Sequence, residues 1–120
     1  MISVENNPAE QALTIAYAGR VKAVDMPECL NKIKHALEGM QPGFRLLADF
    51  SAMADMELAC SRYLGEIMDL CAARGVRNVI RIIPDPRKDI GLGILSFFHY
   101  GPEVAITTCE TLEQAMRELG

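Results

Sequence analysis

The fold is decided by residues 44–75, which begin with Phe44-Arg45-Leu46-Leu47-Ala48-Asp49-Phe50. This compact apolar run lacks strict alternation, which is typical of a strand covered on both faces. Residues 51–58 are more polar and predict a loop. From Ala59 to Arg74 the apolar side chains recur at helical spacing, and Gly75 can take the left-handed conformation that ends a helix. In this order the loop lies at the carboxyl end of the strand, where α/β sheets build their sites.

The composition is typical of one folded domain over residues 1–120, with 50% apolar and 23% charged residues. A net charge of −4 disfavours non-specific binding to nucleic acid. The first residues lack the basic and apolar segments of a signal peptide, and the most apolar stretch, Ile90–Tyr100, is too short to cross a bilayer. We therefore expect a cytoplasmic protein with no transmembrane segment and no nucleic-acid partner.

The residues before the central stretch predict a hairpin and a helix. Ile2–Val4 and Leu13–Ala18 are expected to form antiparallel strands around a polar turn, Glu5–Gln11. In the second strand, apolar residues alternate with small ones, the period of a half-covered strand. Pro27 suits the first turn of a helix that runs to Glu38.

The residues after the central stretch predict two further strand–helix units. Val79–Ile83 and Val104–Thr107 are expected to be strands, followed by helices over Lys88–Tyr100 and Leu112–Leu119. Thr111 and Gln114 match a capping box, and the last helix is expected to bury Leu112, Ala115, Met116 and Leu119. Strands that alternate with helices require parallel pairing. The predicted fold class is α/β: a single domain with a mostly parallel mixed sheet, an N-terminal β-hairpin and about four helices.

Several short pieces, taken in order, resemble the STAS domain family of anti-sigma-factor antagonists (SpoIIAA-like), or a CRAL-TRIO-related STAS-like domain. They are Ala18-Gly19-Arg20-Val21, Asp25-Met26-Pro27-Glu28, Leu46-Leu47-Ala48-Asp49-Phe50-Ser51, Arg74-Gly75-Val76 and Glu110-Thr111-Leu112-Glu113-Gln114-Ala115. The resemblance implies a bacterial signalling domain that binds a protein partner, such as an anti-sigma-factor-like kinase or another regulator. Because the sequence also shows no nucleophile–base, metal-binding or nucleotide-binding pattern, we expect no enzymatic activity and no cofactor.

One position departs from the family pattern. In regulatory members an Asp-Ser pair follows the central strand, and its serine takes a phosphoryl group. Here Glu57 and Leu58 stand at these positions, and leucine has no hydroxyl. Ser61 is predicted to lie one turn into the helix and is not expected to replace the lost acceptor. The expected partner-binding residues are Asp49, Ser51, Asp55, Glu57, Leu58, Ser61 and Arg62.

Three carboxylates near the end of the central strand raise an alternative. Asp49, Asp55 and Glu57 are the residue types of a hard-cation site or of paired acid–base catalysis. Two of them flank a predicted helix start, where acidic side chains are favourable without any function. We therefore expect no catalytic residues and no metal site. The four cysteines show no C-x-x-C spacing and are expected to be buried, reduced thiols.

The predicted helix over Ile90–Tyr100 is apolar nearly all round, with one broad face formed by Ile90, Ile94, Phe97 and Phe98. Such a helix needs cover beyond its own sheet unless it is sandwiched within the domain. The cover could be a second copy in a homodimer, a partner protein, a lipidic ligand or a membrane surface. The alternative function is therefore a carrier or sensor of an apolar small ligand or lipid.

Overall fold

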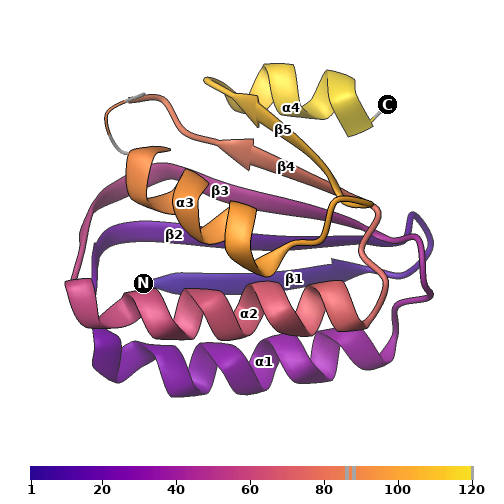
Figure 1. The fold of residues 1–120 in the computed structure, drawn as a ribbon, viewed down its shortest axis with the longest axis horizontal. Coiled ribbons are helices and arrows are strands. Elements are labelled where there is room, and N and C mark those ends of the chain that lie inside the picture. Colours follow the sequence, from indigo (N-terminus) through magenta and orange to yellow (C-terminus); the bar gives the residue numbers. More distant parts are fainter. Residues whose placement is uncertain (86, 88, 120) are drawn as a thin grey trace.

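The computed structural model describes residues 1–85, 87 and 89–119, except for the side chains of residues 89, 90, 92, 97 and 98. The order of strands and helices is the predicted one (Figure 1). The strands are β1 Ile2–Asn7, β2 Ala12–Val21, β3 Arg45–Met56, β4 Asn78–Ile82 and β5 Ala105–Cys109. The helices are α1 Met26–Glu38, α2 Ser61–Ala73, α3 Asp89–His99 and α4 Leu112–Leu119, with short 3-10 turns η1 Ala23–Asp25 and η2 Leu58–Cys60.

The described strands form a five-stranded sheet in the order β1-β2-β3-β4-β5. β1 pairs with β2 antiparallel, and every following pair is parallel. This confirms the predicted hairpin and the mostly parallel sheet. It also makes β3 the central strand. The residues that follow β3 therefore begin at the middle of one end of the sheet.

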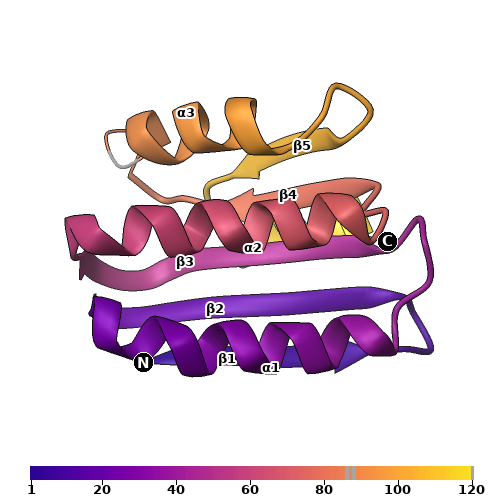
Figure 2. The ribbon, with the colours of Figure 1, turned by 60° about the horizontal axis from the view of Figure 1, so that its bottom comes forward.

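The two faces of the sheet carry different numbers of helices. Figure 2 shows α1 and α2 in front of the sheet, and Figure 1 shows α3 in front of β2 and β3, while α4 packs against β3, β4 and β5 from the other side. Leu46 belongs to the large core under the three helices, and its neighbour Leu47 belongs to the small core under α4. Both side chains are buried, which explains why the central run shows no alternation.

β2 has the alternation that its sequence predicts. Leu13, Ile15 and Tyr17 point into the large core and are at most 3% exposed. The ring of Tyr17 stacks on that of Phe50 from β3, with ring centres 4.7 Å apart. The register between the two strands shifts beside this pair, which is the signature of a β-bulge.

The predicted loop over residues 51–58 is wrong, because β3 continues as a strand to Met56. Its second half pairs with the end of β2, from Ala18 opposite Ala52 to Val21 opposite Met56. β4 accompanies only the first half of β3, up to Asp49.

Other boundaries also move. β1 runs to Asn7, which shortens the predicted turn, and the helix expected from Ala59 begins with η2 before α2 starts at Ser61. β2 runs three residues past its predicted end, to Val21, and the remaining ends shift by one or two residues, the usual uncertainty of helix and strand ends.

The predicted inner face of α4 is partly wrong. Ala115 is fully buried and Leu119 is partly buried, but Leu112 and Met116 are 50% and 47% exposed. Among the described helices, α4 is the one that covers this face of the sheet, so only a narrow stripe of its surface is buried. Its capping is close to the prediction. The Gln114 amide donates to Thr111 Oγ1 (3.2 Å), and Gln114 Oε1 accepts from the Glu110 amide (2.8 Å).

α3 rests on α2 by a close contact between a histidine and a glycine. The Nδ1 atom of His99 lies 2.7 Å from Asp69 Oδ1. On the other side of the ring, Nε2 lies only 2.8 Å from where a Cβ atom of Gly65 would be. Any larger residue at position 65 would therefore meet the imidazole. In the described part of the chain no helix has the length and apolar character needed to cross a membrane.

Candidate functional site

Two neighbouring turns form one end of the molecule. β2 and β3 both extend beyond β4 and end in η1 and η2, which lead into α1 and α2 (Figure 1, left side). Val21 and Met56 are the last paired residues of the two strands, and the Glu57 amide donates to the Val21 carbonyl oxygen (2.9 Å). The turns therefore lie side by side.

The acidic side chains at this end are held by specific partners. Glu57 Oε1 accepts a hydrogen bond from the Ala23 amide (2.7 Å), an amide at the start of a helical turn that has no partner within the turn. Asp55 forms an ion pair with Arg20 (2.7 Å), and the two side chains are 54% and 56% exposed. Glu57 thus links η2 to η1, and Asp55 links β3 to β2.

Asp49 and Ser51 lie elsewhere. Asp49 Oδ1 accepts hydrogen bonds from the Ser51 amide (2.9 Å) and the Ser51 hydroxyl (2.6 Å). Along an extended strand Asp49 is about 20 Å from Asp55, at roughly 3.3 Å per residue. The expectation that three carboxylates gather near one strand end is therefore wrong. Among the described residues, no group of three His, Cys, Asp or Glu side chains is placed to hold a metal ion.

Two large apolar side chains project from the paired turns. Leu58 is 88% exposed in η2, and Val24 is 78% exposed in η1. Ser61 is the first residue of α2 rather than one turn inside it, and its hydroxyl donates to the Leu58 carbonyl oxygen (2.8 Å). Cys60 lies beneath them, fully buried, and burial raises the pKa of its thiol. We use the name "tip" for Val24 and Leu58 together with the groove beside Leu58, which the next paragraph describes.

A groove of about 400 Å³ opens beside Leu58. One wall is the end of β3 and the following turn, residues 53–58; the other walls are Ser61 and Leu64 of α2 and Gly91 and Leu95 of α3. Of the predicted partner-binding residues, the groove brings together Asp55, Glu57, Leu58 and Ser61. Asp49, Ser51 and Arg62 do not line it. The guanidinium of Arg62 lies over the ring of Tyr63 and donates to its hydroxyl (3.1 Å), which raises the pKa of Arg62.

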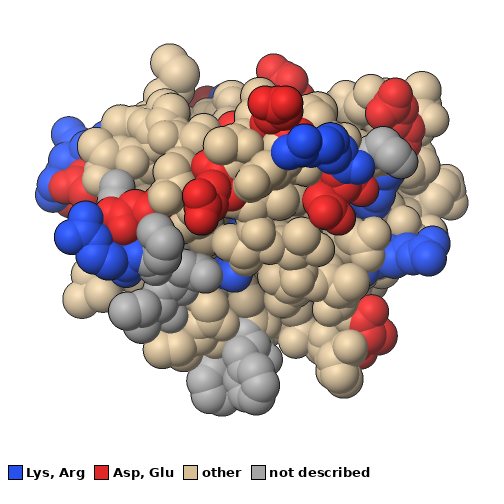
Figure 3. Space-filling view, turned by 90° about the horizontal axis from the view of Figure 1, so that it is seen from above, with Lys and Arg blue, Asp and Glu red and all other residues tan. Residues whose placement is uncertain are grey.

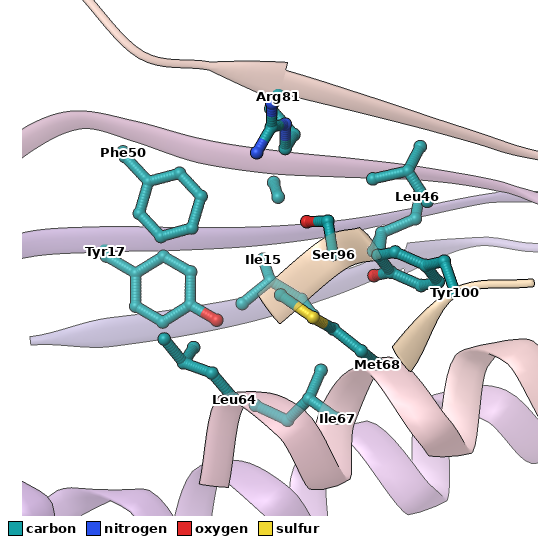
Figure 4. Close-up of a pocket in the computed structure, with 12 residues that line it drawn as sticks. Ile15, Tyr17, Leu46, Phe50, Leu64, Ile67, Met68, Arg81, Ser96 and Tyr100 are labelled. Carbon is teal, nitrogen blue, oxygen red and sulfur yellow. The ribbon is translucent and has the colours of Figure 1, made fainter. Parts of the chain in front are cut away.

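A second hollow, about 30 Å³ in volume and partly open, lies between α2, α3 and the sheet. Figure 4 shows Tyr17 and Arg81 from the sheet and Ser96 from α3 around it. Arg81 is 8% exposed and donates to Thr108 Oγ1 (2.7 Å). Burial raises the pKa values of Tyr17 and Tyr100 well above their ordinary range, so both phenols are neutral. The hollow has room for about one water molecule.

The predicted apolar face of α3 is only partly within the described residues. Ile94 is 55% exposed, whereas the side chains of Ile90, Phe97 and Phe98 lie outside the described residues. The hollow of about 30 Å³ is too small for a lipid or another apolar ligand of ordinary size. The function as a lipid or apolar-ligand carrier therefore stays a prediction.

The charges on the face seen in Figure 3 are mixed. In the described part of that face, Lys and Arg side chains alternate with Asp and Glu, with no extended field of one sign. Sequence-independent binding to nucleic acid needs a continuous basic track, and this part of the surface does not offer one.

The comparisons with known proteins bear on the fold. No protein-family model matches the sequence, and no curated protein matches it. A solved structure of a DUF3478-family protein from Shewanella loihica, described as having a SpoIIAA-like fold, is 16% identical with a TM-score of 0.74. The match covers 100% of this chain and 93% of the other.

Two further solved structures also match. The phosphorylated form of the Bacillus cell fate determinant SpoIIAA is 17% identical with a TM-score of 0.66, over the whole of both chains. An anti-sigma factor antagonist from Mycobacterium paratuberculosis is 18% identical with a TM-score of 0.64, over 99% of this chain and 92% of the other. At identities this low, the structural similarity establishes the fold alone. The chain has the SpoIIAA-like, STAS-like fold that its sequence predicts.

Proposed function

We propose that this chain is a regulatory protein-interaction domain that acts by binding rather than by catalysis, and that a protein partner docks on the tip. The exposure of Leu58 is the observation that carries the proposal. An isolated apolar residue on a surface is ordinary, but Leu58 stands beside Val24 and a largely apolar groove. Burying the Leu58 side chain against a partner would contribute about 1.5–3 kcal/mol.

The hydrogen bonds at the tip support binding over chemistry. The carboxylate of Asp55 is held by Arg20, and that of Glu57 is held by the Ala23 amide. Both acids therefore shape the surface. Their positions also give the tip the usual anatomy of a protein interface, an apolar centre with a polar rim.

The matched structures support the class of partner. One is an anti-sigma factor antagonist, and another is the phosphorylated form of SpoIIAA. By analogy the partner of this chain is an anti-sigma-factor-like kinase or another regulator. Because Leu58 has no hydroxyl, binding here is not switched by phosphoryl transfer at that position.

The test compares three proteins that differ in one exposed leucine. The wild type, Leu58→Ser and the control Leu112→Ser, whose leucine is 50% exposed on α4, are used to capture partners from cells of the source organism. Bound proteins are quantified by mass spectrometry. We expect one partner that the wild type and Leu112→Ser retain and Leu58→Ser loses. Identical sets of captured proteins for all three would contradict the proposal.

The same three proteins also test a homodimer. If two copies meet through the tip, sedimentation equilibrium will give a dimer for the wild type and for Leu112→Ser but a monomer for Leu58→Ser. A monomer for all three leaves a different protein as the occupant of the tip.

A further inference from the structure

The shape and charge of the groove beside Leu58 indicate what kind of segment it receives. We infer that the groove binds a basic amphipathic helix of the partner protein. This inference rests on the proposed function, because it specifies the chemistry of the partner at the same tip.

The shape of the groove suits a helix. It lies between α2 and α3, and the end of β3 closes one side. Its volume of about 400 Å³ falls within the range of pockets that enclose apolar groups. The apolar lining includes Met53, Met56, Leu64 and Leu95. Methionine side chains adapt to the groups they contact, and an amphipathic helix presents its anchors to such a groove one turn apart.

The charge of the groove favours one sign of charge on the polar face of the partner's helix. Asp55 and Glu57 are the ionisable side chains among the described residues that line the groove, and both are acidic. Arg20 compensates Asp55, but that carboxylate remains 54% exposed and can meet a second cation. Lysine or arginine beside the apolar anchors would therefore be favoured over acidic residues.

The same charges disfavour the other occupants. A fatty acid or an anionic membrane would bring negative charge to two carboxylates. A second copy of this chain would bring a molecule whose net charge is −4. A basic helix meets the apolar walls and the acidic side chains together.

Gly91 offers a way to block the groove without damaging the fold. It lines the groove within α3, and a Cβ atom there would meet nothing within 4 Å. Gly91→Met therefore places a large side chain in the groove, and replacing glycine also favours the helix. Gly91→Ala is the matched control, because it gives the same helical benefit but adds only a methyl group.

The probe is a synthetic helical peptide of about 18 residues, with leucine along one face and lysine at all other positions. A second peptide carries glutamate in place of every lysine. Binding is measured by fluorescence anisotropy, and the contact surface is mapped by NMR chemical shifts. We expect the lysine peptide to bind the wild type and Gly91→Ala, and to shift the amides of residues 53–58 and Leu95.

We expect binding to be at least about tenfold weaker for the glutamate peptide and for Gly91→Met. The double variant Asp55→Asn/Glu57→Gln keeps oxygen acceptors for Arg20 and Ala23 while removing both charges. It should weaken the lysine peptide by about 3–10-fold. Glu66→Gln/Glu113→Gln changes the net charge equally at positions outside the groove and should leave binding unchanged.

Several results would overturn the inference. The lysine peptide could fail to bind, both peptides could bind equally well, or the chemical-shift changes could centre outside the groove; each result refutes the inference. Stronger binding of the protein to phosphatidylglycerol vesicles than to the lysine peptide would also refute it. The cellular partner separates this inference from the proposed function. If Leu58→Ser loses the partner while Gly91→Met keeps it, the tip is the docking surface but the groove does not receive the helix. If both variants keep it, both proposals fail.

Discussion

Replacing Gly65 by alanine tests how α3 is held against α2. The new Cβ atom would lie 2.8 Å from His99 Nε2 and 2.9 Å from Cε1, closer than packed atoms approach. The imidazole would have to move, although its other side is hydrogen-bonded to Asp69. Gly65→Ala therefore has two opposite effects on stability. The steric clash at the contact between α2 and α3 destabilises the fold, and the better helix propensity of alanine stabilises it.

The two terms have different origins and can be separated. Alanine stabilises a helix interior over glycine by about 1 kcal/mol. Crowding a packed contact costs about 1–3 kcal/mol. In the wild-type background we expect a net destabilisation of about 1 kcal/mol. In a His99→Ala background the obstacle is gone, and the same change should stabilise the fold by about 1 kcal/mol.

Urea unfolding of the wild type, both single variants and the double variant gives the coupling energy directly. We expect about 2 kcal/mol between positions 65 and 99. The effect of Gly65→Ala on the unfolding midpoint should therefore change sign between the two backgrounds. A coupling below about 0.5 kcal/mol would refute the reasoning, because it would mean that His99 does not pack on Gly65.

Three further predictions address the thiols, α4 and the tip. Burial raises the pKa of Cys29 to about 11 and that of Cys71 to about 12, against 9.0 for an ordinary thiol. The folded state therefore keeps these protons while the unfolded state loses them. Urea unfolding at a series of pH values should show that the contribution of these two thiols to stability is constant below pH 9 and falls above it, by about 3 kcal/mol up to pH 11 for Cys29 and by about 4 kcal/mol up to pH 12 for Cys71. A flat profile from pH 9 to pH 11 would contradict this. Arg45 donates to the Leu119 carbonyl at the end of α4 and to the Glu10 carbonyl, so Arg45→Ala should cost about 1–2 kcal/mol and speed amide exchange in α4; unchanged exchange would count against this contact. Leu58→Ser should change the unfolding free energy by less than about 0.5 kcal/mol, because the side chain is 88% exposed; a larger loss in urea unfolding would show that Leu58 supports the fold.

The element order could be predicted from the sequence because burial leaves a period in it. Leu13, Ile15 and Tyr17 alternate in β2, and the adjacent Leu46 and Leu47 face two different cores. The second half of β3 leaves no such period. Residues 51–56 are mostly exposed, and their backbone pairing with β2 holds them extended. That pairing depends on the length of β2, which the local sequence of β3 does not contain.

The candidate site was predictable only where its residues are close in sequence. Asp55, Glu57, Leu58 and Ser61 were expected together and line one groove. Asp49 was wrongly grouped with them, because a loop was expected directly after it where β3 in fact continues. Leu95 comes from a helix more than thirty residues downstream, and its place in the groove follows from how α3 packs on α2.

The hydrogen bond from the Ala23 amide to the Glu57 carboxylate links the turn that leads into α1 with the turn that leads into α2. A carboxylate has two oxygens, so a cation of a binding partner can contact the second oxygen of Glu57 while Oε1 keeps the Ala23 amide. A partner can therefore dock at this end of the molecule without unfastening the entry to α1.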